Sequence, residues 1–479
     1  MKDISVGSTF SGIGSPEFAL KHIYGDDFER KVHLKWACDF EMNAKESFLA
    51  NHNPDKFYDN IYYMTNSKKD IMNMPDDFIK KTAKQKVSKL EDDFFNLGNI
   101  EDVDLYIFGF PCQNFSHANK NRTAYSLDNV DMDNTHKHQK DLGYSATKTT
   151  LVFESMKIIE ELSKRKNPLK YFIAENVKGL VQHDPAYIWD VDEEMTSVNF
   201  EKLTKSKLKV YRSVEVDGET KYYKRRNGLV LDGEEYNGYP SLVNKDFDGK
   251  KKFIGKTLYV IENAFIELGY EIEWKVLNAK DYSFGYDEKV KGGVQNRERI
   301  FIVGVKEGLK NTFEFPIEEE FDSSNMDKVI NYLDPLNNDK EELLLKDEHV
   351  VEKENKRKSS GVCNQTHFLN NVVYEQGQRI YSAESKSPCL TCVGEPRFHI
   401  KENDKDIFRS STGKEMLSIQ GFPVGDKNRG KKNKDGTFNI KEFKYVVSDS
   451  QLKKQAGNSM SVSKMKVILE VLIKMHQEQ

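Results

Sequence analysis

The sequence lacks long hydrophobic runs and has few cysteines. No stretch of 18 consecutive apolar residues occurs among its 479 residues, and no apolar segment follows Met1. We therefore predict neither a membrane-spanning helix nor a secretory signal peptide. Five cysteines without a dense spacing pattern exclude a disulfide-stapled scaffold and fit a reducing compartment. We expect a cytoplasmic protein with no membrane partner.

The sequence also lacks an excess of positive charge. Its formal net charge is −4, whereas a nucleic-acid-binding protein usually carries a basic balance. Lysine-rich segments at 221–226 and 427–434 could still form a local basic face, so the net charge neither supports nor excludes nucleic-acid binding. The length is sufficient for a large core and for two domains.

A complete metal-binding pattern is missing as well. Cys389 and Cys392 have the spacing of zinc ligands, but no second cysteine pair accompanies them. His367 and His399 would have to complete the site. We predict no bound metal.

The first 40 residues have the pattern strand, glycine-containing loop, helix, strand. The loop contains Gly12 and Gly14 and leads into a helix that opens near Glu17. Glycines let the backbone approach a ligand closely, and the amino terminus of a helix favours negative charge. The second strand, 32–38, ends at Asp39, a position from which a carboxylate can accept hydrogen bonds from ribose hydroxyls. The combination favours a nucleotide-type ligand.

Cys112 follows a short apolar segment. Residues 104–108 are apolar and aromatic, as expected of a buried parallel strand. Ligands bind at the carboxyl ends of such strands, so Cys112 would project into a site, and Pro111 would fix the backbone before it. From this segment alone, a catalytic nucleophile and an inert buried thiol carry equal weight.

The remaining pattern predicts an α/β fold. Further strands are expected at 171–174, 271–277 and 299–303, with helices at 257–268 and near 462–476. Strands that alternate with helices favour a parallel, Rossmann-like sheet.

Three segments interrupt the alternation of strands and helices. Residues 117–148 are polar and are expected to form a long loop, and residues 185–254 are expected to form an insertion with a hairpin at 216–219. Residues 306–446 are polar, and we expect irregular structure there.

Seven short segments along the sequence resemble, in the same order, the motifs of the cytosine-5 DNA methyltransferase family of bacteria and phages. The matching motifs are Phe10-Ser11-Gly12-Ile13-Gly14, Asp39-Phe40, Pro111-Cys112-Gln113, Glu175-Asn176-Val177, Gln295-Asn296-Arg297-Glu298-Arg299, Arg409 and Glu415 with Gln420-Gly421-Phe422-Pro423, and Gly457-Asn458-Ser459. A single three-residue match would be noise, whereas seven in the family's order exclude coincidence.

The resemblance implies an S-adenosylmethionine-dependent methyltransferase that modifies carbon 5 of a cytosine flipped out of duplex DNA. Cys112 would form a covalent adduct with the base, Glu175 would act at ring N3, and Arg299 would contact O2. Arg297 would help to order the site, although a salt bridge on the strand is an alternative for it. Asn176 would hold local backbone.

The resemblance also implies a set of cofactor contacts and a lid. The contacts are Phe10, Ser11, Gly12, Gly14, Asp39, Phe40, Pro111, Leu151, Asn458 and Ser459. The adenine contact is open between Asn60-Ile61 and Asp70-Ile71, and the distance from Asp39 favours Asn60-Ile61. The loop after Cys112 would cover the flipped base and end at Thr149-Thr150-Leu151.

By the same resemblance the chain divides into two domains. A catalytic, S-adenosylmethionine-binding domain would comprise 1–305 and 447–479, with the 185–254 insertion, and a target-recognition domain would comprise 306–446. The implied partner is double-stranded DNA, and a restriction enzyme is a candidate second partner. One copy of the motifs predicts a monomer.

Two rival functions remain. An RNA cytosine-5 methyltransferase would share the motifs, but the Cys-Phe-Thr element of the family's tRNA branch is not found here. A non-catalytic DNA-binding homologue would not need Cys112, Glu175 and Arg299 together.

Overall fold

The chain forms two compact units. The computed structural model describes residues 1–74, 81–112, 144–182, 187–202, 211–216, 219–227, 245–247, 250–252, 256–352, 362–369, 378–430, 432–433 and 436–479. The first unit comprises Met1–Pro111, Thr150–Val177 and Phe265–Gln479, and the second comprises Cys112–Thr149 and Lys178–Ala264. The segment 306–446 thus lies in the first unit, and the 185–254 segment lies in the second. The predicted domain boundaries stay a prediction.

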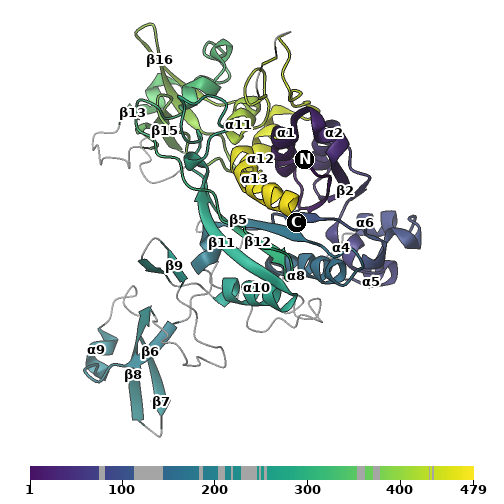
Figure 1. Ribbon diagram of the computed structural model, residues 1–479. Helices are drawn as coiled ribbons and strands as arrows, with labels where there is room; N and C mark the ends of the chain where they lie inside the picture. The colour runs from purple at the N-terminus through teal and green to yellow at the C-terminus, as the bar shows by residue number, and fades with distance from the viewer. Residues whose placement is uncertain are drawn as a thin grey trace. The chain divides into compact units, whose positions relative to one another are not determined.

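A seven-stranded sheet forms the centre of the first unit (Figure 1). In sheet order its strands are β11 (Tyr270–Asn278), β12 (Glu298–Lys306), β5 (Tyr171–Val177), β4 (Leu105–Phe108), β1 (Ile4–Thr9), β2 (Val32–Cys38) and β3 (Lys56–Tyr58). The predicted α/β fold is confirmed, and each predicted strand is present at or near its expected bounds.

The expected parallel sheet contains one antiparallel strand, β12. β12 pairs antiparallel with both β5 and β11, whereas β5, β4, β1, β2 and β3 are parallel. The physical reason is the connection: residues 279–297 join β11 to β12 without the crossover helix that a parallel neighbour requires. β12 therefore begins at the edge of the sheet where the parallel strands end.

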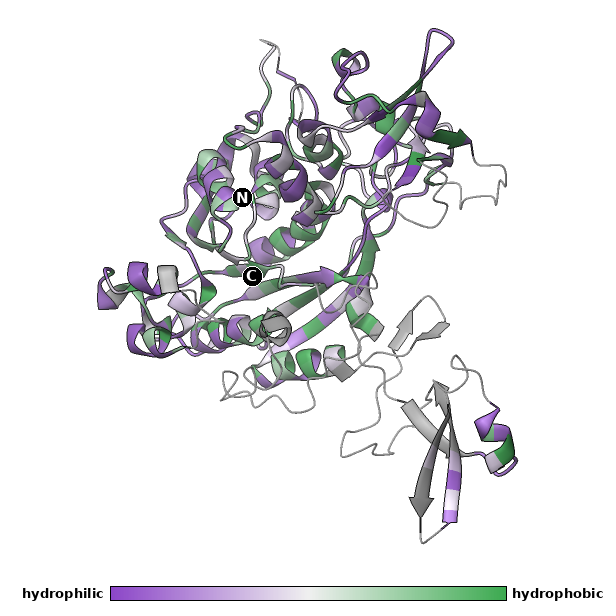
Figure 2. Cartoon of the chain, turned by 180° about the vertical axis from the view of Figure 1, so that it is seen from behind, coloured by the Kyte–Doolittle hydropathy of each residue, from purple (hydrophilic) through white to green (hydrophobic). Residues whose placement is uncertain are grey.

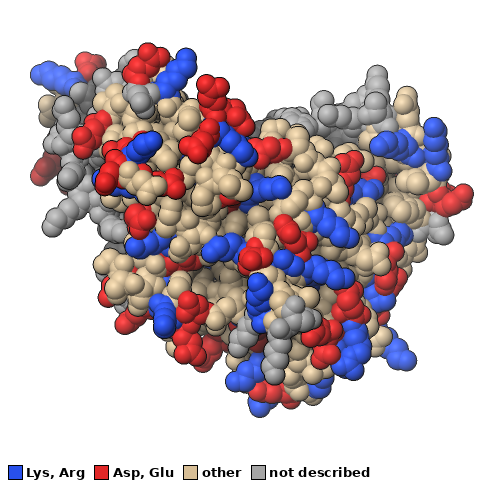
Figure 3. Space-filling model, turned by 90° about the horizontal axis from the view of Figure 1, so that it is seen from above, with Lys and Arg blue, Asp and Glu red and all other residues tan. Residues whose placement is uncertain are grey.

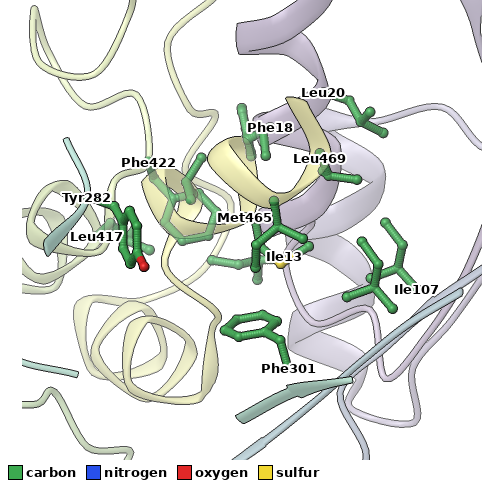
Figure 4. Packing of buried hydrophobic residues seen from close by; sticks show 14 of the residues in the cluster. Ile13, Phe18, Leu20, Ile107, Tyr282, Phe301, Leu417, Phe422, Met465 and Leu469 are labelled. Atoms are coloured by element: carbon green, nitrogen blue, oxygen red, sulfur yellow. The ribbon is translucent and has the colours of Figure 1, made fainter. Parts of the chain in front are cut away.

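Both faces of the central strands are buried, which explains their continuous apolar sequences. On one face, Ile107 of β4 and Phe301 of β12 join a core with α1 (Ser15–Tyr24) and α13 (Val462–Glu478). Figure 4 shows these side chains in one cluster with Phe18 of α1 and Met465 of α13. On the other face, Phe172 packs on Phe265 with ring centroids 4.6 Å apart.

The segment 306–446 contains regular strands, so the expectation of irregular structure was wrong. A five-stranded sheet consists of β13 (Val350–Glu352), β14 (Gln365–Leu369), β15 (Arg379–Ser382), β16 (Arg397–Glu402) and β17 (Lys405–Ser410). The strands are short and partly exposed, so their sequences lack the apolar runs that mark the central sheet.

A buried ion pair joins this sheet to the following helix, α11 (Gly413–Gln420). The Arg409 guanidinium donates two hydrogen bonds to the Glu415 carboxylate, at 2.8 and 3.1 Å, and Glu415 also caps α11 through Thr412. Burial disfavours the charged carboxylate, but Arg409 outweighs it and lowers the pKa of Glu415.

The second unit has its own small sheets. One consists of β6 (Tyr187–Val191), β8 (Glu219–Asn227) and β7 (Tyr211–Val216), and the other of β9 (Lys245–Phe247) and β10 (Lys250–Lys252). β7 and β8 pair from Val216 to Glu219, which confirms the predicted hairpin.

The other helices connect the strands. They are α2 (Phe28–Lys31), α3 (Met42–Asn51), α4 (Ile61–Thr65), α5 (Lys68–Asn73), α6 (Lys81–Val87), α8 (Tyr144–Ser163), α9 (Ser197–Glu201), α10 (Lys256–Glu267) and α12 (Asp449–Asn458). Hydrophobic residues concentrate on the central strands and the helix sides that meet them (Figure 2). Among the described residues, no helix is both long and apolar enough to cross a membrane. Figure 3 shows basic and acidic side chains interspersed over one face.

Candidate active site

The glycine-containing loop after β1 is held against the end of β2. The Gly12 N–H donates to Asp39 Oδ2 at 2.8 Å, and the Glu41 N–H donates to Oδ1 at 2.9 Å. Gly12 and Gly14 have φ angles of 57° and 86°, which L side chains rarely adopt. Burial raises the pKa of Asp39, although the backbone N–H groups oppose the shift. Asp39 thus orders the loop.

Ser8, which stands before the loop, has a buried acidic partner. Its hydroxyl donates to Glu17 Oε1 at 2.9 Å, and Glu17 is 1% exposed in the first turn of α1. Burial raises the pKa of Glu17 to about 7. Glu17 was predicted only as part of a helix opening, and no sequence pattern marks its raised pKa.

The two residues after β2 differ in their surroundings. Asp39 faces the loop, whereas Phe40 is 68% exposed at the carboxyl end of the strand. Asn60 and Ile61 follow β3, the next parallel strand, and the Asn60 side chain caps α4 by accepting from the Tyr62 N–H. Asn60 and Ile61 therefore lie at the same edge of the sheet as Asp39, because parallel strands end together.

The alternative adenine contact lies further along the chain. Asp70 is exposed within α5 and bonds to Ser67 of the same turn. Its helix follows α4, so it does not stand at a strand end. The role of Asn60 and Ile61 stays a prediction, and their position favours them over Asp70-Ile71.

A small cavity gathers several predicted site residues of the first unit. Its volume is about 50 Å³. Its walls include Phe10, Ser11, Gly12, Glu175, Asn458 and Ser459. Motifs from the amino terminus, the middle and the carboxyl terminus of the sequence thus meet at one place. Predicted cofactor contacts that do not line this cavity are Gly14, Asp39, Phe40, Asn60, Ile61, Pro111 and Leu151.

Glu175 and Arg299 form an ion pair at the edge of the sheet. Arg299 Nε lies 3.2 Å from Glu175 Oε1, and the two side chains are 15% and 12% exposed. Arg299 pairs with Val177, two residues beyond Glu175, so both side chains point to the same face. A cation and an acid thus stand together in a largely desolvated place.

The turn that leads to Cys112 is fixed by the neighbouring strand. Asn176 Nδ2 donates to the Phe110 carbonyl at 2.9 Å, which confirms the prediction that Asn176 holds local backbone. Glu175 packs close to Gly109, where an added Cβ would come within 3.4 Å of Oε2. Pro111 ends this part of the first unit. Cys112 is partly buried, forms no disulfide and is the first residue of the second unit.

The Arg297 guanidinium is buried and bonds to three backbone carbonyls. The residue is 2% exposed, and its guanidinium donates to the carbonyls of Leu390, Gly457 and Ser459 at 2.8–2.9 Å. Burial lowers the pKa of Arg297, and Arg299 adds to the effect. These contacts fit an ordering role rather than a salt bridge on the strand. Its membership of the catalytic set stays a prediction.

Sequence reasoning missed two buried contacts around these residues. Gln295 Nε2 donates to Gln420 Oε1 at 2.5 Å, and Gln420 Nε2 donates to the Ser459 carbonyl, so three motifs are connected. Lys464, which is 0% exposed, donates to the Arg297 carbonyl at 3.1 Å. The sequence offered one indication that Lys464 is buried: it lies four residues before Ile468 on α13, so the two side chains share the same face of the helix.

Part of the predicted lid lies outside the described residues. Gln113 and residues 117–143 belong to this part. Residues 144–148, predicted as loop, begin α8, which also contains Thr149, Thr150 and Leu151. Among the described residues, no group of three or more His, Cys, Asp or Glu side chains is arranged to hold a metal ion. Cys389 instead lies 3.4 Å from Arg297 Nη1.

Comparisons with known proteins agree with this arrangement. The chain is 25% identical to the orphan methyltransferase M.SPRI of Bacillus phage SPR over 66% of its length, and spans 41% of that relative. It is 26% identical to the type II methyltransferase M.HaeII of Haemophilus aegyptius, over 78% of the chain and 75% of the relative. The chain therefore spans less than half of the length of a relative such as M.SPRI.

The fold has a solved counterpart. The Dnmt2 methyltransferase of S. pombe matches 98% of each chain with a TM-score of 0.50 and 13% identity, which is a likeness of fold. The profile of the C-5 cytosine-specific DNA methylase family matches residues 4–202 and 242–474. The mixed α/β methyltransferase fold is thus confirmed, and the chain belongs to the C-5 cytosine-specific DNA methylase family.

Proposed function

We propose that this protein transfers a methyl group from S-adenosylmethionine to carbon 5 of cytosine in duplex DNA. The observation that carries the proposal is the Glu175–Arg299 pair, which stands beside the cavity lined by Ser11, Gly12 and Ser459. Glu175, Arg299 and the glycine-containing loop lie at the edge of the sheet where ligands of α/β proteins bind. The family supplies the reaction class.

The residues of the loop fit S-adenosylmethionine. A carboxylate has room for about four hydrogen bonds, and the two backbone donors at Asp39 leave acceptor sites for ribose hydroxyls. The exposed Phe40 ring offers a face on which an adenine can stack. The cofactor is larger than the cavity of about 50 Å³, so its binding requires side chains such as Phe10 or Met460 to move. The bound cofactor would supply the methyl group.

Cys112 would act as the nucleophile. Carbon 5 of cytosine is too weak a nucleophile to accept a methyl group directly, so the Cys112 thiolate would add to carbon 6 and make carbon 5 enamine-like. Carbon 5 would then take the methyl group as its bond to the cofactor sulfur breaks. Loss of the carbon 5 proton to solvent would re-form the carbon 5–carbon 6 double bond and break the carbon–sulfur bond to Cys112. The ring would regain its aromaticity and the thiolate would be released.

Glu175 and Arg299 would support this addition. A carboxylic acid at ring N3 favours attack at carbon 6 because it offsets the negative charge that develops on the ring. The Arg299 guanidinium would contact O2 and stabilise the same charge. The ion pair keeps both groups at one place before the base arrives.

The base must leave the helix to be modified, because its reactive carbons are inaccessible inside a duplex. We assign the choice of sequence to residues 306–408 rather than to the 185–254 segment. Residues 306–408 are in one unit with the Glu175–Arg299 pair, whereas the 185–254 segment belongs to the second unit. Replacing the first segment should change the methylated sequence, and deleting the second should leave it unchanged. Methylation mapping of the two variants tests this assignment.

Type II methyltransferases among the relatives support a place in a restriction–modification system, acting on DNA in the cytoplasm. The test of the activity is an assay with purified protein, S-adenosylmethionine and duplex DNA or transfer RNA, followed by mass spectrometry of the nucleosides. We expect 5-methyldeoxycytidine from DNA and no 5-methylcytidine from RNA. Product from RNA alone, or from neither substrate, would contradict the proposal.

A further inference from the structure

A second, larger cavity lies in the first unit and shares no lining residue with the cofactor cavity. Its volume is about 450 Å³, within the range of about 300–1,000 Å³ that small-molecule sites occupy. The segment between β11 and β12 forms one wall, and α11 with the residues after it forms another. Two motif residues, Gln295 and Gly421, line it, whereas Cys112, Glu175 and Arg299 do not.

Aromatic rings form much of the wall. Tyr282, Phe284, Tyr286 and Tyr332 all line the cavity. The Phe284 and Tyr286 rings are nearly parallel, with an interplanar angle of 5°. His22 stacks on Phe284 at 4.5 Å between ring centroids and hydrogen bonds to the Tyr286 hydroxyl. The two rings are thus fixed before any ligand binds.

The cavity also contains a buried carboxylate, Asp327, that accepts no side-chain hydrogen bond from a cation among the described residues, although the charge of Lys386 acts on it. Asp327 is 8% exposed, and among the described residues its oxygens accept from neutral groups, the Tyr332 hydroxyl at 2.5 Å and Asn331 Nδ2 at 3.4 Å. The nearby Lys386 ammonium donates to main-chain carbonyls of Gly293 and Asp327 instead. Burial accordingly raises the pKa of Asp327.

A second buried polar group lacks a partner. The Ser418 hydroxyl lines the cavity, the residue is 2% exposed, and no hydrogen-bond partner for Oγ occurs among the described residues. Unsatisfied buried polar atoms are rare and mark places where a ligand or water can bind.

The charge of the lining selects the class of ligand. The charged residues that line the cavity are Asp287, Asp327, Asp426 and Lys427. Two cations outside the lining act on these acids: Arg429 lies 4.0 Å from Asp426, and the charge of Lys386 acts on Asp327. Within the lining itself acids outnumber bases, and Asp327 is the buried one, so a cationic ligand is favoured over an anionic one. Aromatic faces also attract cations through their negative quadrupole.

We propose that this cavity is a binding site for a small organic cation, an ammonium group on an apolar body. Asp327 provides the counter-ion, the Phe284, Tyr286 and Tyr332 rings enclose the apolar body, and Ser418 supplies a hydrogen bond. The site is distinct from the cofactor cavity, and its occupancy is measurable without methyl transfer.

The first experiment uses the full chain and three probes of similar size. Calorimetry at fixed ionic strength measures binding of benzyltrimethylammonium, benzyl alcohol and benzenesulfonate. We expect saturable one-to-one binding of the cation, at least tenfold tighter than the alcohol, and no binding of the anion. Equal binding of the alcohol or the anion, or no binding of the cation, would overturn the proposal.

The second experiment locates the site. Asp327→Asn keeps the shape of the cavity and should weaken cation binding at least tenfold while leaving the alcohol unaffected. Glu341→Gln removes one negative charge from an exposed residue outside the cavity and should change neither. Tyr286→Leu, which keeps the acid and removes a ring, should also weaken the cation. Unchanged cation binding in both cavity variants would place the binding elsewhere and refute this site.

Discussion

Arg299 Nε lies 3.2 Å from Glu175 Oε1, and the antiparallel direction of β12 is what brings the two residues together. A parallel strand at this position would carry its first residues to the opposite edge of the sheet. The reversed strand instead delivers Arg299 to the carboxyl end of β5, where Glu175 lies. The sheet topology thus has a direct consequence for the proposed chemistry.

Glu175→Gln should slow methyl transfer by about 10²–10⁴-fold, the usual contribution of a general acid or base. The amide keeps the shape of the side chain but cannot deliver a proton to N3. Single-turnover rates measure the effect, and DNA affinity should change little. Glu273→Gln, an exposed carboxylate on the neighbouring β11, is the matched control and should retain the full rate. A normal rate for the Glu175 variant would reduce Glu175 to a structural role.

Asp39→Asn should weaken binding of S-adenosylmethionine by about 1–3 kcal/mol, because a charged hydrogen-bond acceptor at the loop is lost. Calorimetry gives the affinity directly. Asp70→Asn changes the exposed acid of the alternative motif and should bind the cofactor normally. If the Asp70 variant weakens binding and the Asp39 variant does not, the ribose contact of Asp39 and the preference for Asn60-Ile61 over Asp70-Ile71 are both wrong.

Glu17→Gln should make stability less dependent on pH. The pKa of Glu17 is raised from 4.5 to about 7, so its contribution to stability is fully present below pH 4.5 and is lost as the pH rises through about 7. The glutamine side chain is neutral throughout. The free energy of unfolding of the variant relative to wild type should therefore increase between pH 5 and pH 8, by at most about 3 kcal/mol. Urea unfolding at pH 5 and pH 8 measures this difference in the free energy of unfolding. An equal difference at the two pH values would show that Glu17 is ionised in the folded protein at both.

Arg409→Met should cost about 3–5 kcal/mol of stability, because it leaves the Glu415 carboxylate buried without its cation. The double variant Arg409→Met, Glu415→Gln should cost clearly less, since the amide oxygen still caps α11 and carries no charge. Urea unfolding of the single and double variants compares the two. Equal losses would indicate that packing, and not the unpaired charge, dominates.

The sequence was sufficient to predict the central strands. Residues 105–108 and 171–174 are buried on both faces, so their apolar runs reveal them without any partner. The antiparallel direction of β12 could not be predicted, because the apolar pattern of a buried strand does not depend on the direction in which the strand runs. The five-stranded sheet was missed because its strands, β13 to β17, are short and partly exposed.

Residue types with local roles were also predictable. Asn176 was expected to hold backbone, and it donates to the Phe110 carbonyl. Long-range contacts were not, since the carbonyls that Arg297 binds come from residues more than 90 positions away. Lys464 and Glu17 are buried only because distant segments cover them, which no local pattern records.

The most direct test of the account is bisulfite sequencing of duplex DNA incubated with S-adenosylmethionine and either the wild-type chain or Cys112→Ala, with equal cofactor binding by calorimetry as the control. The account predicts protected cytosines within one recurring sequence for the wild type, and protection below about 1% of that level for the variant, a loss of at least about 3 kcal/mol in transition-state stabilisation. Protection by the variant at the wild-type level, or none by the wild type, would contradict the account.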